Sequence, residues 1–267
     1  MFYMEYLLTL LKAVAFQLIG VLGIFFFFGF LLSKLQEHTQ RNYHRSVGWK
    51  GILWTAWIGT PIHELGHVFF AKIFHHKINE VQIFRPNEQT GGLGHVNHSY
   101  NKHSWYQKIG NFFIGGAPMI FGSIILSLML YYLLPNGKEI FIPLTAEVGS
   151  VLTFLNSLKI TFLNLFAWEN LSTWHFWLFL YISFCIASHI APSKQDREGM
   201  WKGFVWIIIL LFIVNGVAIG LGSDITGYVL GINQYLGIFV AIFSYATIIS
   251  LLHLILSTII FYPFKKH

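Results

Sequence analysis

The segment IGTPIHELGHVFFAKIF, residues 58–74, places His63, Glu64 and His67 in an otherwise apolar stretch. An α-helix turns by about 100° per residue, so the two histidines lie on one face, one turn apart. Imidazoles at this spacing can hold one metal ion, with Glu64 beside it. The H-E-x-x-H pattern is typical of sites in which the histidines bind Zn²⁺ and the glutamate acts as general base on water.

A chance match and polar contact between helices are the alternative explanations of this triplet. An ionisable side chain at mid-membrane costs roughly 2.5–3.5 kcal/mol, so three of them in one apolar segment indicate a function. Gly59 and Gly66 keep the same helix narrow enough for a substrate or a neighbouring helix to come close. We therefore predict a metal site formed by His63 and His67, with Glu64 as the catalytic residue.

Composition predicts the surroundings of this site. The chain has 267 residues, of which 55% are hydrophobic and 10% are charged, whereas soluble domains carry about 25% charged residues. This excludes an ordinary soluble domain and predicts an all-α polytopic membrane protein. No polar block is long enough for a second domain, so we expect one membrane-embedded domain over 1–267. Six runs are long enough to cross a bilayer, namely 13–32, 50–74, 109–134, 174–191, 204–222 and 235–262.

Two segments outside these runs have patterns of their own. Residues 144–166 carry their apolar side chains on one face, which predicts an amphipathic helix at the membrane interface. EVQIFRP (80–86) and GLGHVNHSY (92–100) flank NEQTGG, a pattern typical of a β-hairpin with a glycine-containing turn. Bare strand edges are not tolerated in lipid, so we expect the hairpin at the membrane surface or beside a wet cleft.

The formal charge of +6 comes from basic residues that flank the apolar runs. They form no patch interleaved with aromatic residues, so we expect no nucleic-acid partner. Six spans put both termini on one side. With that side cytoplasmic, the inner segments hold eleven basic residues and the outer ones six. We therefore expect an integral multi-pass protein of the bacterial cytoplasmic membrane, with both termini and the hairpin in the cytoplasm.

A hydrolytic zinc site normally needs a third protein ligand. The chain has two aspartates, Asp196 and Asp224. In the expected topology Asp196 lies on the side that the second half of 50–74 reaches, and Asp224 lies on the other side, which favours Asp196. The alternative is structural, because Ser193 and Asp196 form an S-x-x-D capping pattern at the start of a helix.

His189 is the rival third ligand. It is equally explained as a group that orients a ligand or binds substrate, or as a buried histidine bonded to a carbonyl. The remaining histidines near the hairpin have spacings that match no standard ligand pattern, so we expect solvated loop residues at His75, His76, His95, His98 and His103.

Taken in order, these motifs resemble the site-2 protease group of intramembrane zinc metalloproteases. HELGH (63–67) is followed by GGAP (115–118) in the next run and by HIAPSKQD (189–196) late in the chain. The resemblance covers about residues 50–203. It implies that His63, His67 and Asp196 bind zinc and that Glu64 is catalytic.

The chain also departs from the family pattern. The family commonly has Asn-x-x-Pro leading to Asp-Gly, whereas here His189 stands in place of the asparagine and Arg197 follows Asp196. The chain has no room for an inserted PDZ or nucleotide-sensing domain, such as some relatives have. The resemblance therefore implies a minimal, divergent member.

Three functions follow as hypotheses. The leading one is an intramembrane zinc endopeptidase that hydrolyses a peptide bond in or near a transmembrane segment of a membrane-protein substrate. The second is an ion or proton transporter or channel whose path is lined by the motif residues, although the sequence lacks repeated, broken spans in corresponding halves. The third is a non-catalytic relative that binds membrane proteins. The presence of Glu64, the expected catalytic residue, argues against this third hypothesis.

Overall fold

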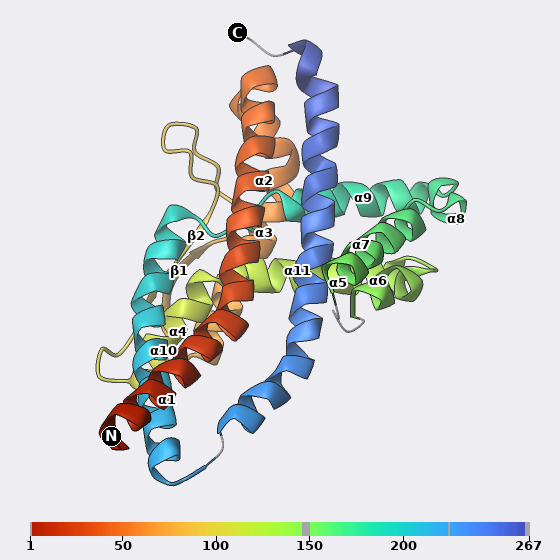
Figure 1. The fold of residues 1–267 in the computed structure, drawn as a ribbon. Helices are drawn as coiled ribbons and strands as arrows, with labels where there is room; N and C mark the ends of the chain where they lie inside the picture. The colour runs from red at the N-terminus through yellow and green to blue at the C-terminus, as the bar shows by residue number, and fades with distance from the viewer. Residues whose placement is uncertain (1, 146–149, 224, 265–267) are drawn as a thin grey trace.

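The computed structural model of the chain describes residues 2–145, 150–223 and 225–264. Helices make up most of this part, and a two-stranded sheet follows the third helix (Figure 1). In chain order the elements are α1 (Phe2–Gln17), the π-helical turn η1 (Leu18–Leu22), α2 (Gly23–Val47), α3 (Trp49–Ile73), β1 (Lys77–Gln82), β2 (His95–Ser99), α4 (Trp105–Gly115), α5 (Ala117–Leu133), α6 (Gly137–Thr145), α7 (Val151–Leu165), α8 (Trp168–Leu171), α9 (Trp174–Ala187), α10 (Lys194–Gly220), α11 (Ile225–Phe261) and η2 (Tyr262–Phe264).

Four helical segments of the described chain, or five if one bent pair is counted, are long and apolar enough to cross a membrane. The helical segments that meet both conditions are Tyr3–Val47, Val151–Leu171, Lys194–Gly220 and Gly237–Phe264. The pair α4 and α5, bent by 58°, adds a fifth when it is taken as one span. The segment α3 is not among them, because its ionisable motif lowers its hydropathy, and α9 has only 14 residues. These helices support an α-helical membrane protein, and the count of six spans stays a prediction.

The predicted amphipathic helix over 144–166 is divided in the structure. Its first residues belong to α6, which ends at Thr145, and α7 begins after Ser150, whose side chain accepts a hydrogen bond from Thr153 N. Leu144 is buried in the core, whereas Val151 and Leu152 are exposed. A single helix over 144–166 is therefore wrong, because the extended Ser150 begins a new helix; residues 146–149 lie outside the described part of the chain, and α6 and α7 pack against each other.

The N-terminal helix is long and is held against α10. Gln17 and Asn215 exchange two hydrogen bonds: Gln17 Nε2 donates to Asn215 Oδ1 (2.9 Å) and Asn215 Nδ2 donates to Gln17 Oε1 (2.8 Å). Tyr6 Oη donates to the carbonyl of Gly216 (2.7 Å). Polar side chains between membrane helices are stabilised by such partners, so these bonds fix α1 on α10.

Helix α3 packs against α2, α5 and α9. Glycines allow this close packing. An added Cβ at Gly59 would clash with the carbonyl oxygen of Cys185 in α9, and one at Gly66 would lie 3.2 Å from the carbonyl oxygen of Ala117 in α5. The expected role of these two glycines is therefore confirmed: they let neighbouring helices contact the turns that carry the motif.

The predicted hairpin is confirmed, with shifted strands. Its strands pair antiparallel, from Lys77 opposite Ser99 to Gln82 opposite His95. They cover 77–82 and 95–99 instead of 80–86 and 92–100, because residues 83–94 form a long loop. Main-chain hydrogen bonds close this loop, including one from Arg85 N to Leu93 O (2.6 Å). Both strands pack on α3, which brings the hairpin beside the motif.

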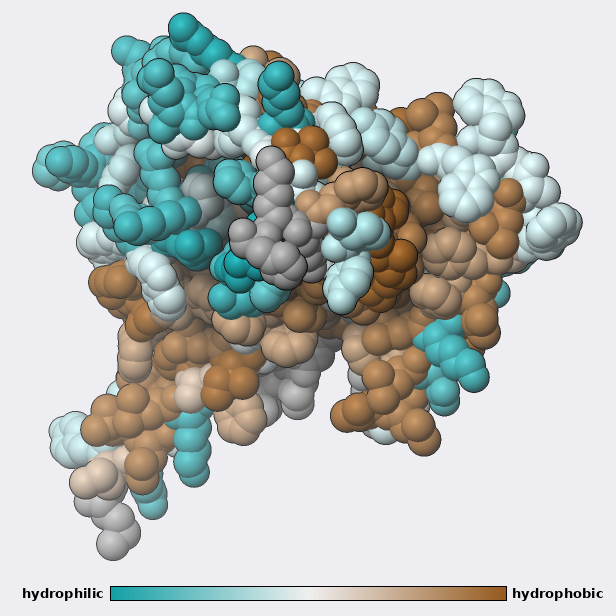
Figure 2. Space-filling view, turned by 90° about the horizontal axis from the view of Figure 1, so that it is seen from above, coloured by the Kyte–Doolittle hydropathy of each residue, from teal (hydrophilic) through white to brown (hydrophobic). Residues whose placement is uncertain are grey.

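Apolar side chains cover much of the outer surface. Figure 2 shows hydrophobic residues over most of the face seen from above, with hydrophilic residues gathered on one side. On α10, Val205, Val214 and Val217 are 53%, 54% and 58% exposed. Soluble proteins rarely expose large contiguous apolar patches, and lipid is the solvent that such a surface fits.

We expect Gly59→Ala to destabilise the protein. The added methyl group would meet the main-chain carbonyl of Cys185, which cannot rotate away as a side chain can. Overpacking of this kind costs about 1–3 kcal/mol. Thermal unfolding in detergent, followed by tryptophan fluorescence, measures the loss.

Gly220→Ala is the matched control. Gly220 is also helical, and nothing lies within 4 Å of a Cβ added there. Alanine is the better helix former, so this change should leave the unfolding midpoint unchanged or raise it. An unchanged midpoint for Gly59→Ala would contradict the close contact between α3 and α9.

Candidate metal centre

Three side chains from two helices converge on one point. His63 and His67 come from α3, and Asp196 comes from the first turn of α10. The two Nε2 atoms lie 3.2 Å apart, His67 Nε2 lies 3.2 Å from Asp196 Oδ1, and His63 Nε2 lies 3.5 Å from Asp196 Oδ2. Ligands about 2.0–2.1 Å from a tetrahedral zinc ion lie about 3.3 Å from one another. The spacing of these donor atoms therefore fits a zinc ion.

Main-chain carbonyls orient both histidines. His63 Nδ1 lies 2.6 Å from the carbonyl oxygen of His189, and His67 Nδ1 lies 2.8 Å from that of Ile114. A carbonyl only accepts, so each Nδ1 carries the proton and donates it. In the neutral rings the Nε2 atoms are then bare and face the shared point. This is the arrangement of metal-binding histidines, whose other ring nitrogen donates to a carbonyl or carboxylate.

Pro118 explains why the Ile114 carbonyl is free to accept this bond. In a continuous helix that carbonyl would accept from the main-chain N–H four residues later, at position 118, but proline has none. The chain bends here between α4 and α5. The GGAP sequence thus supplies an acceptor for His67, in addition to the close packing that small residues allow.

Asp196 is both a helix cap and a member of the cluster. Asp196 N donates to Ser193 Oγ (3.2 Å) and Ser193 N donates to Asp196 Oδ2 (2.7 Å), which makes a capping box at the start of α10. The same carboxylate faces the two imidazoles. Asp196 can therefore cap α10 and belong to the cluster at the same time. The capping hydrogen bonds hold its carboxylate toward the two imidazoles.

Glu64 lies beside the cluster, next to the hairpin loop. Its side chain is buried, with 5% exposure. The main chain of Gly94 approaches so closely that an added Cβ would lie 3.0 Å from Glu64 Cγ and 2.7 Å from the carbonyl oxygen of Gln82. A residue with a side chain at 94 would therefore push the loop away from Glu64.

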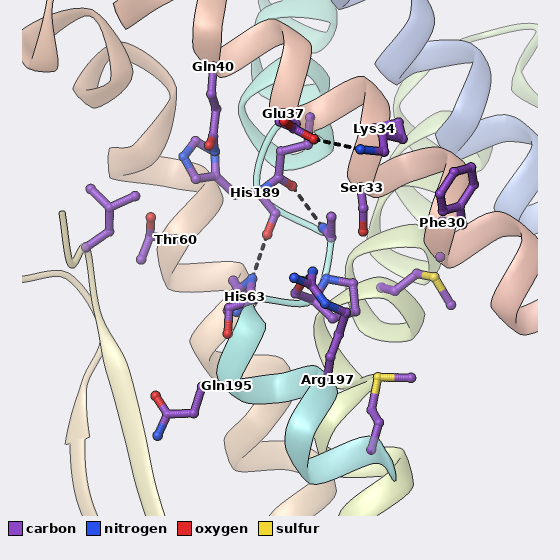
Figure 3. A pocket seen from close by; sticks show the side chains of 18 of the residues that line it. Phe30, Ser33, Lys34, Glu37, Gln40, Thr60, His63, His189, Gln195 and Arg197 are labelled. Carbon is purple, nitrogen blue, oxygen red and sulfur yellow. Dashed lines mark hydrogen bonds and ion pairs between the residues drawn. The ribbon is translucent and has the colours of Figure 1, made fainter. Parts of the chain in front are cut away.

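A first cavity, of about 770 Å³, reaches the site from α2. Figure 3 shows it from close by, with Phe30, Ser33, Lys34, Glu37 and Gln40 of α2 and with Thr60, His63, His189, Gln195 and Arg197. Gln36 and Gln40 fix the loop after α9: Ala191 N donates to Gln36 Oε1 (2.9 Å) and Gln40 Nε2 donates to Ser188 O (3.1 Å). Helix α2 therefore forms one wall of this cavity. It also fixes the loop after α9, in which the His189 carbonyl orients His63.

A second cavity, of about 580 Å³, reaches the same site from the hairpin and α4. Glu64, His63 and Gly94 line both cavities. The walls of the second are polar and include His98 and Asn111. Both cavities therefore reach Glu64. The walls of the first cavity are partly aromatic, and the walls of the second are polar.

His189 lies outside the cluster of three donor groups. Its Nδ1 lies 3.1 Å from the carbonyl oxygen of Cys185, and its main-chain carbonyl orients His63. The side chain of His189 is thus a buried histidine bonded to a carbonyl, while its main-chain carbonyl orients His63; its role as an orienting group or as an alternative ligand stays a prediction. Its Nε2 is buried without a hydrogen-bond partner in the described part of the chain. Asp224 lies outside the described residues.

The prediction of a solvated loop residue was wrong for His76, which is buried, and His98 is only partly exposed beside it. His76 is 5% exposed and His98 is half-buried, and their Nδ1 atoms lie 3.0 Å apart. No spacing rule reveals this pair, because it depends on how β2 lies against the residue that follows α3. His95 is exposed and lies 3.5 Å from Glu80, and His75 and His103 are exposed as expected.

No protein-family model, curated protein or solved structure matches this chain.

We expect Ser193→Ala to lower the free energy of unfolding by about 1 kcal/mol, because Asp196 N loses its acceptor. Asp196→Asn should cost less than Asp196→Ala, since the amide oxygen still accepts from Ser193 N. Unfolding of chelator-treated protein measures these differences without any effect of metal. Equal losses for Asp196→Asn and Asp196→Ala would contradict the capping role of this side chain.

Proposed function

We propose that this protein is an intramembrane zinc endopeptidase, a minimal and divergent member of the site-2 protease-like group. It hydrolyses a peptide bond in or near a transmembrane segment of a membrane-protein substrate. One observation carries the proposal: His63, His67 and Asp196 meet at distances that fit zinc, with Glu64 beside them and open to two cavities.

His63, His67 and Asp196 would hold a zinc ion, which would supply a Lewis acid for the scissile carbonyl and for a water molecule. Glu64 takes a proton from the water as its oxygen bonds to the carbonyl carbon. It then delivers the proton to the nitrogen as the C–N bond breaks. The side chain stays in position for both transfers, because it is buried between α3 and the Gly94 main chain.

The α2 cavity suits a peptide that passes from lipid to a polar site. Phe25, Phe26 and Phe30 line its apolar part, and Ser33 and Gln36 line a polar part. A helical substrate has its carbonyls in hydrogen bonds, so it must unwind locally before the bond is cleaved. The polar groups of the cavity offer the unwound main chain new partners.

In this proposal the protein crosses a lipid bilayer several times and acts within it. We place it in a bacterial cytoplasmic membrane; the distribution of basic residues over the six predicted spans favours both termini in the cytoplasm. The exposed valines of α10 support contact with lipid.

Metal content tests the site. We expect about one zinc per chain in protein purified in detergent without chelators, as measured by mass spectrometry. Glu64→Gln should keep the zinc, because Glu64 is not a ligand, whereas His67→Ala and Asp196→Ala should lose it. Wild-type protein free of zinc would contradict the proposal.

Cleavage tests the activity. We expect wild-type protein, expressed in a bacterial host, to create new peptide termini inside transmembrane segments of host proteins. Glu64→Gln should reduce them by about 10²–10⁴-fold, the usual contribution of a general base. Ion flux through proteoliposomes that Glu64→Gln alters, with no new termini, would favour the transporter hypothesis instead.

A further inference from the structure

Two histidines outside the metal cluster form a chain of hydrogen bonds that ends in the polar cavity. His76 lies directly after α3, and His98 lies in β2. His76 Nε2 lies 2.8 Å from the carbonyl oxygen of Gln107, and His76 Nδ1 lies 3.0 Å from His98 Nδ1. The ring of Tyr100 stacks on that of His76, with centroids 5.1 Å apart. The pair is thus held from several sides.

The Gln107 carbonyl fixes which nitrogen carries each proton. A carbonyl only accepts, so His76 Nε2 is protonated and donates to it. In a neutral ring His76 Nδ1 is then bare and accepts from His98 Nδ1. The remaining nitrogen, His98 Nε2, is therefore bare as well and is a hydrogen-bond acceptor.

Both rings are neutral near pH 7. Burial lowers the pKa of His76, and burial together with the neighbouring His76 lowers the pKa of His98 to about 4. If both His76 and His98 were protonated, each Nδ1 would carry a proton. The two N–H groups would then face each other, and the hydrogen bond between the rings would be lost. The acceptor at His98 Nε2 is therefore present under ordinary conditions.

His98 lines the same cavity as Glu64, His67 and Asp196. Among the side chains that the structure describes, none forms a hydrogen bond with His98 Nε2. His98 thus brings an acceptor that has no described donor to the wall of the cavity beside the cluster.

We propose that His98 Nε2 binds the substrate main chain by accepting a hydrogen bond from a peptide N–H beside the scissile bond. This inference rests on the proposed endopeptidase function and assigns a binding residue to it. A peptide N–H moved from water or from its own helix into a cavity needs a new acceptor, since an unpaired one is costly. The bonds from His98 through His76 to Gln107 place the proton of neutral His98 on Nδ1, so that its Nε2 is the acceptor.

Two substitutions separate the roles of the two ring nitrogens. In His98→Asn the amide nitrogen takes the place of Nδ1 and still donates to His76, but nothing replaces Nε2. In His98→Gln the amide reaches the position of Nε2 and offers an oxygen there, while the bond to His76 is lost. His103→Asn is the control, because His103 is exposed in the loop after β2.

The probes are acetohydroxamic acid and N-acetyl-leucyl-leucine hydroxamate, titrated into full-length, zinc-loaded protein in detergent with the zinc content measured in parallel. Only the second carries peptide N–H groups. We expect His98→Asn to weaken the peptidyl probe by about tenfold, the effect of one hydrogen bond, and to leave acetohydroxamic acid unchanged. His98→Gln and His103→Asn should bind both probes within about threefold of wild type.

Three results contradict this inference. Unchanged affinity of His98→Asn for the peptidyl probe excludes the bond. Equal weakening in His98→Asn and His98→Gln assigns the effect to the link with His76 and not to Nε2. Wild-type protein that holds no zinc, or that binds neither hydroxamate, overturns the endopeptidase function itself and this inference with it.

Discussion

Two imidazole nitrogens and a carboxylate oxygen lie within 4.8 Å of one another, and a positive charge between them would stabilise the carboxylate. Both Nδ1 atoms are already committed to carbonyls, so the rings turn bare Nε2 atoms toward the carboxylate. The zinc ion that we propose would be bound by all three donors at once. This cluster joins the middle of α3 to the first turn of α10, and the surrounding helices are arranged to keep the two in place.

Helix breaks supply the groups that orient the site. Pro118 leaves the Ile114 carbonyl without its partner in the helix, and that carbonyl accepts from His67. The end of α9 places the His189 carbonyl beside His63. The start of α10 fixes Asp196 through its capping box. Free main-chain groups occur at helix ends, so a site built from them must lie where several helices begin or stop.

The sequence predicts the residues of the centre better than their roles. HELGH has a fixed helical spacing, so His63 and His67 could be placed together from sequence alone. The choice between Asp196 and His189 needed the path of the chain from α9 to α10. The pattern of Ser193 and Asp196 predicted a cap correctly, but it gave no sign that one carboxylate serves both cap and cluster.

Other features depend on contacts that the local pattern does not contain. The pairing of His76 and His98 follows from the position of β2 against the end of α3, which no spacing of histidines specifies. The single helix predicted over 144–166 was wrong because periodicity was read across the end of α6. The segment 50–74 illustrates the opposite effect: the polar residues that define the site lower the hydropathy by which a span is recognised.

Zinc K-edge X-ray absorption spectroscopy of the purified wild-type protein tests the central claim most directly. The account predicts a first shell of nitrogen and oxygen at about 2.0–2.2 Å, with outer-shell scattering from two imidazoles and no sulfur near 2.3 Å. A shell that contains sulfur, a shell with fewer than two imidazoles, or protein without zinc would contradict it.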